Sequence, residues 1–181
     1  MNFPDTGSKG SQIYLNLKAG EPVRGIFMDD PYLFRIHWLS GKSVLCTMPR
    51  GDCAQCDLGN KSSFRFKINV IIKENEAYIA KIWEQGITSY EALKALHSDY
   101  NLEKHVMKIT RNGTTKDDTT YSIIPLKDGQ VNEEMFLKLK EVKLHNLKGQ
   151  TISLDSKPDV EDWQPPKDSD FIPNELSEPP F

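Results

Sequence analysis

The sequence predicts a mainly β fold, a five-stranded barrel with one inserted helix, followed by an acidic C-terminal tail. Three observations predict it. Several segments alternate apolar and polar residues with the two-residue period of a strand that has one buried face. Short clusters of Gly, Pro, Asn and Asp separate these segments, as expected of turns. One helical pattern interrupts the series of strands before its last two members.

The first half of the chain contains the first extended segments. Residues 1–11 are polar and contain Gly and Ser, which indicates a flexible N-terminus. Residues 13–27 predict one or two strands around a turn at 19–22, and a second turn signal follows at 29–31. In the next predicted strand, residues 32–38, alternate positions share one face, which carries Tyr32, Phe34, Ile36 and Trp38.

Residues 64–142 supply the remaining elements. Residues 64–72 alternate as a half-buried strand, and a tight connection leads into another strand at 77–84. Residues 88–100 have helical spacing, with Thr88 or Ser89 as the N-cap. Two strands then form a hairpin with a long polar tip, and a short amphipathic helix follows, at residues 105–111, 119–126 and 132–142.

This order of elements, over about 110–130 residues, fits an OB-fold. The OB-fold is a small, partly open barrel whose exposed face and loops commonly bind oligonucleotides. An α+β sheet of another topology has the same elements and stays an alternative. We expect one OB-fold domain at residues 12–150, with a metal-binding loop at 37–60, and a tail at 151–181.

Charge is distributed unevenly along the chain. The whole chain has a net charge of −3, but residues 155–181 hold eight acidic residues and two lysines, a net charge of −6, which leaves +3 for residues 1–154. The acidic segment also contains six prolines and few apolar residues, so we predict that it is disordered. The sequence shows neither a secretory signal nor an apolar run of membrane-spanning length, which predicts a cytoplasmic protein.

All three cysteines and one histidine lie close together in the sequence. Eight residues separate His37 from Cys46, six separate Cys46 from Cys53, and two separate Cys53 from Cys56. Structural Zn²⁺ binds four N or S ligands tetrahedrally, and three cysteines with one histidine are a known set. An odd number of cysteines argues against a disulfide framework, and the βαβ context of a redox dithiol is missing. We therefore predict structural zinc on these four residues, although the fourth ligand could instead be Asp52, Asp57 or His97.

Aromatic and basic residues alternate in the strand after the metal loop, which indicates a surface for nucleic acid. Binding of single strands needs cations along the backbone and aromatic rings on which bases stack. The cationic candidates are Arg35, Lys42, Lys61, Arg65, Lys67, Lys81, Lys108 and Arg111. The aromatic candidates are Tyr32, Phe34, Trp38, Phe64, Phe66 and Trp83.

Position along the strands ranks these candidates. Phe64 and Phe66 share a face with apolar residues of the same strand, which favours a position in the core for both. Trp38 and Trp83 stand beside charged residues near the metal loop or a strand end, and are the stronger stacking candidates. Arg65 and Lys67 lie on the face opposite the apolar one, and are the stronger phosphate ligands.

The sequence carries no motif of an enzyme active site. It has neither a GxxxxGK[ST] loop nor a GxSxG elbow, and residues 1–150 contain no acidic cluster at metal-ion spacing. Three cysteines and one histidine leave no open coordination position on zinc. We therefore predict a binding protein and not an enzyme.

Residues 12–147 contain, in order, the segments EPVRGIF, PYLFRIHW, GKSVLC with the CxxC behind it, SSFRFKINV, YIAKIWEQG, ALHSDY, VMKITRNG and TTYSIIPL. As a set, these segments resemble phage single-stranded DNA-binding proteins, in particular a zinc-containing group of tailed phages. The His-Cys-Cys-Cys order is also similar to that of the T-even phage helix-destabilising protein, with shorter intervals here. The terminal SEPPF is similar to the acidic tails ending in Phe of bacterial and phage single-stranded DNA-binding proteins, although the acidic residues are dispersed here.

The resemblance implies a sequence-independent single-stranded DNA-binding protein. Such a protein protects and organises the strand in phage DNA replication, recombination and repair, in the cytoplasm of a bacterial host. Its zinc would be structural, and its tail would recruit replication or recombination proteins through Asp168, Asp170, Glu175, Glu178 and Phe181. Two alternatives stay open: a zinc-containing adaptor or transcription regulator that binds another protein, and a single-stranded RNA-binding regulator.

Overall fold

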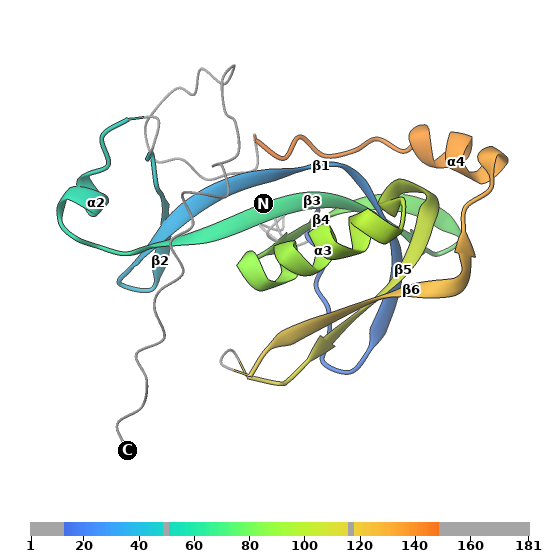
Figure 1. Ribbon diagram of the computed structural model, residues 1–181, viewed down its shortest axis with the longest axis horizontal. Helices are drawn as coiled ribbons and strands as arrows, with labels where there is room; N and C mark the ends of the chain where they lie inside the picture. The colour runs from blue at the N-terminus through green and yellow to red at the C-terminus, as the bar shows by residue number, and fades with distance from the viewer. Residues whose placement is uncertain (1–12, 49–50, 116–117, 149–181) are drawn as a thin grey trace, which may run out of the picture.

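The computed structural model describes residues 13–48, 51–115 and 118–148, which form a mainly β, antiparallel structure (Figure 1). Six strands make one sheet in the order β4-β3-β1-β5-β6, with β2 paired to β1 off this path. The strands are β1 (Pro22–Leu39), β2 (Lys42–Leu45), β3 (Ser62–Glu74), β4 (Ala77–Gln85), β5 (His105–Asn112) and β6 (Thr120–Gln130). The predicted mainly β class is confirmed, with six strands instead of five. The sheet is open, because no strand pairing joins β4 to β6 in the described part of the chain.

Strand β1 is the longest element and pairs with three others. Its first part, Pro22–Gly25, pairs with β5, and its later part pairs with β3 and then with β2. Residues 29–31, predicted as a turn between two strands, lie inside β1. A β-bulge absorbs them: the register with β3 shifts between Met28 and Tyr32, and Asp29 has a φ of 60°. The predicted turn is therefore wrong.

The main core lies inside the curved sheet, where α3 (Ile87–Asp99) also packs. Phe66 of β3 and Trp83 of β4 are 0% and 1% exposed, and their rings meet edge to face with centroids 5.9 Å apart. The ring of Tyr121 on β6 meets Trp83 at 5.6 Å. The sheet therefore curls until side chains from its two ends touch. The prediction that Phe64 and Phe66 favour the core is confirmed.

The segment before β1 contacts β4, at one end of the strand order, and β5, which is next to the other end. The Leu15 N–H donates to the carbonyl of Ile82 on β4 at 2.9 Å, and the Gly20 N–H donates to the carbonyl of Arg111 on β5 at 2.8 Å. The segment makes only isolated bridges with its neighbours, so the strand predicted at its start is not formed. It lies instead beside the opening between β4 and the β5–β6 hairpin.

A second, smaller core covers part of the outer face of β1 and β3. Helix α4 (Glu133–Lys140), which matches the predicted short helix, buries Phe136 and Leu139. They pack with Ile26, Met28 and Ile71. The chain after α4 returns along β3, where the side chain of Asn69 bonds the backbone N–H and carbonyl of His145, both at 3.1 Å.

The remaining helices range from 3 to 13 residues in length. They are α2 (Ala54–Asp57), the 3₁₀ turn η1 (Leu102–Lys104) and α3. The helical pattern of α3 is confirmed, but the helix begins earlier than predicted: its N-cap is Gly86, and Thr88 and Ser89 lie inside the first turn. None of the helices in the described residues is long and apolar enough to cross a membrane.

Two predicted segments lie outside the described residues. One is the flexible N-terminus at 1–11, and the other is the disordered tail at 151–181. The tail includes the five predicted partner-binding residues, Asp168, Asp170, Glu175, Glu178 and Phe181.

Candidate metal centre and nucleic-acid interface

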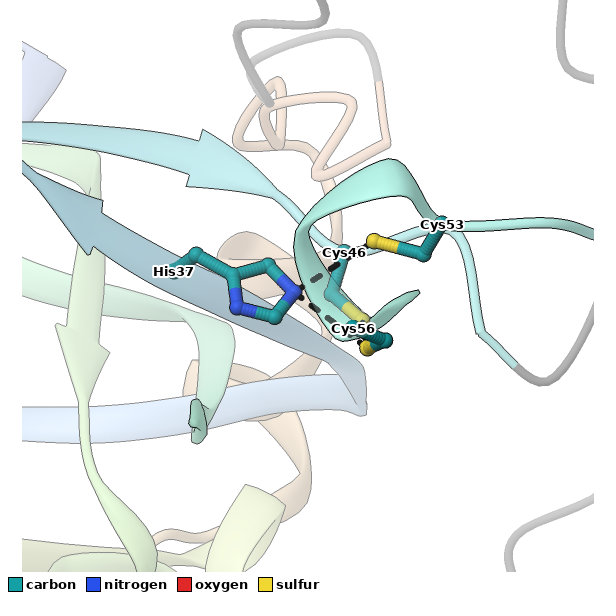
Figure 2. A group of neighbouring side chains, drawn as sticks. All are labelled: His37, Cys46, Cys53 and Cys56. Atoms are coloured by element: carbon teal, nitrogen blue, oxygen red, sulfur yellow. Dashed lines mark hydrogen bonds between the residues drawn. The ribbon is translucent and has the colours of Figure 1, made fainter. Parts of the chain in front are cut away.

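The four predicted zinc ligands lie together at the end of the molecule that carries β2 and α2 (Figures 1 and 2). The ligand atoms of His37, Cys46, Cys53 and Cys56 are all within 4.8 Å of one another. The first three residues are buried, at 0%, 6% and 5% exposure, and Cys56 is half-buried. The structure thus gathers the four side chains that the sequence singled out into one N/S donor cluster.

A tight hairpin positions two of the ligands. Strands β1 and β2 are joined by Ser40 and Gly41, which have φ values of 48° and 81°. Positive φ at both central residues is the signature of a type I′ turn, whose twist matches that of the strands. The hairpin places His37 opposite Val44 and leaves Cys46 directly after β2.

A single helical turn, α2, positions the other two. Cys53 is its N-cap and Cys56 lies within it. The Asp57 N–H closes the turn by donating to the Cys53 carbonyl at 3.0 Å. Gly59, with a φ of 78°, then reverses the chain, and its N–H donates to the Cys56 carbonyl at 2.9 Å. The CxxC spacing therefore places both sulfurs on the side of the turn that faces β1.

The interatomic distances fit a tetrahedral zinc ion. Zn–S bonds of about 2.3 Å and Zn–N bonds of about 2.0–2.1 Å place two sulfurs about 3.8 Å apart, and a sulfur and a nitrogen about 3.5 Å apart. The Sγ atoms of Cys46 and Cys56 are 3.6 Å apart. Nε2 of His37 lies 3.4 Å from Cys53 Sγ and 3.5 Å from Cys56 Sγ. These distances match edges of one tetrahedron, so the residues present fit Zn²⁺.

The second nitrogen of His37 has a partner of its own. Nδ1 lies 3.3 Å from the carbonyl oxygen of Lys61, the residue before β3. When Nδ1–H donates to this carbonyl, Nε2 keeps the lone pair that faces the sulfurs. Metal-binding histidines use such a contact to fix both the ring and its tautomer. The start of β3 therefore holds the imidazole in a ligand orientation.

The thiols of the cluster differ in acidity. Backbone N–H groups of Cys56 and Thr47 donate to Cys53 and lower the pKa of its thiol to about 5. Burial, followed by the neighbouring thiols of Cys46 and Cys53, raises the pKa of the Cys56 thiol to about 12. Thiolates this close repel one another, and a divalent cation offsets that repulsion. The donor set is therefore suited to a cation.

None of the three alternative fourth ligands joins the cluster found among the described residues. Asp52 and Asp57 are exposed, and His97 is exposed on α3. His37 is thus the fourth member of the set. Four protein ligands leave no open coordination position, so a metal bound here would be structural.

Four of the predicted nucleic-acid contacts form a row on the outer face of β1 and β3. The rings of Tyr32 and Phe34 are stacked, with centroids 5.8 Å apart and planes 17° apart. Phe34 is the cross-strand partner of Arg65. The Arg65 guanidinium lies 6.0 Å from the ring centroid of Trp38, which is 49% exposed. We call these four residues, Tyr32, Phe34, Trp38 and Arg65, the aromatic–basic stripe.

Two of the stronger candidates are instead buried, which corrects both predictions. Trp83, expected to stack on bases, is 1% exposed because it packs in the main core against Phe66. Lys67, expected to contact phosphate, is 2% exposed. Its Nζ lies 3.5 Å from the carboxylate of Glu84 and 5.1 Å from the ring centroid of Phe34. Burial lowers the pKa of Lys67, although Glu84 opposes the shift.

The other predicted cations lie away from the stripe. Arg35 is exposed on the opposite face of β1, where it donates to the Ser62 hydroxyl at 2.8 Å. Lys42 is exposed on β2, near the metal cluster. Lys108 and Arg111 are half-buried on β5. The structure therefore brings together only part of the predicted cationic set.

Two residues that the sequence did not single out extend this surface. The ring centroid of Tyr14 lies 5.8 Å from Nζ of Lys67, and Glu84 pairs with the same ammonium. Glu84 is the cross-strand partner of Lys67. That register is a property of the β3–β4 pair, and no local pattern in either strand indicates it.

Comparison of the chain with protein-family models, with curated proteins and with solved structures finds no match. The metal cluster and the aromatic–basic stripe are therefore the features from which a function can be inferred.

Proposed function

We propose that this protein binds single-stranded DNA, largely independently of sequence, and protects and organises the strand in phage replication, recombination and repair. The aromatic–basic stripe is the observation that carries the proposal. Sequence-tolerant binding of single strands combines rings on which bases stack with cations that follow the backbone, and the stripe holds both. From Tyr32 to Trp38 it extends about 20 Å along β1, since a strand rises about 3.3 Å per residue. That length accommodates several stacked bases.

We further propose that the sheet is the partly open barrel of an OB-fold. Strand β1 is central, with β3 and β4 on one side, β5 and β6 on the other, and α3 between β4 and β5 in the chain. OB-folds bind oligonucleotides on their second and third strands and on the loops after the first and fourth. If β1, β3, β4, β5 and β6 correspond to the five strands of the OB-fold, the metal loop follows the first strand and the β5–β6 connection follows the fourth. The stripe then lies beside the metal loop.

Zinc would serve this function by fixing one end of the stripe. His37 directly precedes Trp38 in β1, and the Cys46 N–H donates to the Arg35 carbonyl at 2.9 Å. An ion bound by the four-residue cluster would therefore hold the β1–β2 hairpin and α2 in one arrangement. The direction of the Trp38 ring depends on that hairpin.

A comparison of three nucleic acids tests the proposed function. Fluorescence anisotropy should show that a dT oligomer binds far more tightly than duplex DNA and more tightly than the matching single-stranded RNA. The single-strand affinity should fall with salt, by a log–log slope of about −0.7 for each neutralised phosphate. Equal affinity for the duplex would contradict base stacking. Preference for RNA would favour the RNA-binding regulator.

The adaptor alternative also has an observation in its favour. Leu58 and Met48, on either side of the cysteine pair, are 75% and 47% exposed. Apolar side chains exposed on a metal-bound loop are suited to contact another protein. Absence of binding to all three nucleic acids in the same experiment would favour this adaptor.

We propose that the acidic segment at 151–181 competes with DNA and recruits replication or recombination proteins. The charges support it, since residues 155–181 carry −6 and residues 1–154 carry +3. The position of the last described part of the chain supports it too. His145 is held to Asn69 on the outer face of β3, the face that also carries Arg65. A segment tethered beside the stripe has a high effective concentration there.

Deletion of residues 155–181 should raise the affinity for single strands, most at low salt, because salt screens the competition. It should also abolish recruitment of a replication partner. Removal of Phe181 alone should abolish recruitment and leave DNA affinity nearly unchanged, because its ring and α-carboxylate suit an apolar pocket edged by basic residues. Anisotropy and pull-down assays measure the two effects. Identical DNA binding by the full and truncated chains at low salt would contradict the competition.

A further inference from the structure

A polar cleft of about 350 Å³ lies at the opening of the sheet, next to the aromatic–basic stripe. Its volume is within the range of about 300–1,000 Å³ that is typical of small-molecule sites. The end of β4, the β5–β6 hairpin and the segment before β1 form its walls. The polar side chains that line it are Tyr14, Asn16, Glu84, Gln85, Arg111 and Tyr121. We call it the tyrosine cleft.

Lys67 connects the cleft to the stripe. Its Nζ lies between two rings, 5.1 Å from the centroid of Phe34 in the stripe and 5.8 Å from the centroid of Tyr14 in the cleft. The same ammonium is 3.5 Å from the carboxylate of Glu84. Phe34 and Tyr14 therefore lie against the same buried ammonium, which places the cleft close to the stripe.

The guanidinium in the cleft is fixed before any ligand arrives. Arg111 donates through Nη1 to the carbonyl of Leu17 at 3.5 Å and through Nη2 to the hydroxyl of Thr119 at 3.1 Å. A guanidinium has five N–H donors, and each Nη carries two of them. Each Nη of Arg111 therefore has one N–H beyond these two bonds. Fixed donors of this kind lower the ordering cost of binding.

The carboxylate in the cleft argues against a phosphate ligand and for a base. The buried Lys67 balances the charge of Glu84, but the carboxylate still accepts hydrogen bonds, and the phosphodiester of a nucleic acid has no N–H or O–H to donate to it. A carboxylate accepts up to about four hydrogen bonds, so the ion pair leaves acceptor capacity. Its side chain is 31% exposed and thus open to a ligand.

We propose that the tyrosine cleft receives one guanine base of the bound single strand, an inference that rests on the proposed function. Guanine presents two acceptors, O6 and N7, which match the N–H donors of an arginine. On its other edge it presents two adjacent donors, N1–H and the N2 amino group, which match a carboxylate such as Glu84. The rings of Tyr14 and Tyr121 supply aromatic surface for the base. Thymine has no pair of adjacent donors, so it satisfies the carboxylate less well.

The test compares oligomers that differ in one base. A dT oligomer of about 10 nucleotides, within the usual site size, is compared with the same oligomer carrying one central dG or one central dC. Wild-type protein should bind the dG oligomer about tenfold more tightly than the all-dT oligomer. Equal affinities, or a preference for dC, would overturn the guanine assignment and leave single-strand binding standing. Failure to bind any of the oligomers would overturn both.

Base analogues test the contacts without altering the protein. Inosine, which lacks the N2 amino group, and 7-deazaguanine, which lacks N7, should each lose most of the preference. Glu84→Gln should reduce the difference in affinity between the dG oligomer and the inosine oligomer, which lacks the N2 amino group. Tyr78→Ala, on β4 but outside the cleft, should leave the dG preference unchanged. A dG preference that survives both analogues would overturn the assignment.

Discussion

Replacement of both Cys53 and Cys56 by serine is expected to abolish metal binding and to unfold the loop between β2 and β3. These residues supply half of the proposed ligand set, and both sulfurs contact the imidazole of His37. Structural zinc contributes apparent free energies of about 10–16 kcal/mol in zinc-finger peptides near pH 7, so its loss has a large effect. Elemental analysis should find about one Zn²⁺ per native chain and none in the variant. DNA binding should weaken as well, because the metal no longer holds the β1–β2 hairpin that positions Trp38.

The loop itself offers a matched control. Asp52→Asn and Asp57→Asn, made together, remove two exposed carboxylates from the same loop and should leave zinc content unchanged. Absence of zinc from native protein purified without chelators would contradict the metal site. Retention of zinc by His37→Ala would remove only the assignment of the fourth ligand.

Alanine at both Phe34 and Trp38 is expected to weaken single-strand binding by at least about thirtyfold at every salt concentration. A stacked base is worth about 1–3 kcal/mol, so two rings contribute about 2–6 kcal/mol, and each 1.4 kcal/mol is about tenfold in affinity. Neither ring belongs to the main core, so the fold should survive. Anisotropy titrations with a dT oligomer measure the loss.

Charge and stacking can be separated with single variants. Arg65→Gln should make the salt dependence shallower by about 0.7 in log–log slope, the share of one phosphate on a single strand. Tyr78→Ala, an exposed ring on β4 outside the stripe, is the control for the aromatic pair. Lys138→Gln on α4 is the control for the charge. Equal losses in the stripe variants and the controls would contradict a specific role for the stripe.

Local patterns predicted the parts of the structure that depend on neighbours in the sequence. Alternation along β1 predicted that Tyr32 and Phe34 share a face, and their rings are stacked. Cysteine spacing predicted the donor cluster, because the turn at Ser40 and the helical turn of α2 are both encoded locally. These features need only the residues next to them.

Other features depend on partners far along the chain and could not be predicted. Trp83 stands beside Glu84 and looks exposed in the sequence, but β4 is buried on both faces, with Ile82 at 0% exposure. Lys67 is buried because the register of β3 with β4 places it opposite that glutamate. The bulge at residues 29–31 uses the same residue types as a turn, and only pairing with β3 distinguishes the two.

The central position of β1 also sets the order in which the fold can form during synthesis. Pro22 pairs with Thr110, so the sheet stays incomplete until β5 has emerged from the ribosome. The metal cluster is local and needs only the chain up to the start of β3. At about 5–20 residues per second, synthesis of the 50 or so residues from there to the end of β5 takes roughly 3–10 s. We expect zinc captured in that interval to fix the alignment of β1 with β3 while the rest of the sheet is missing.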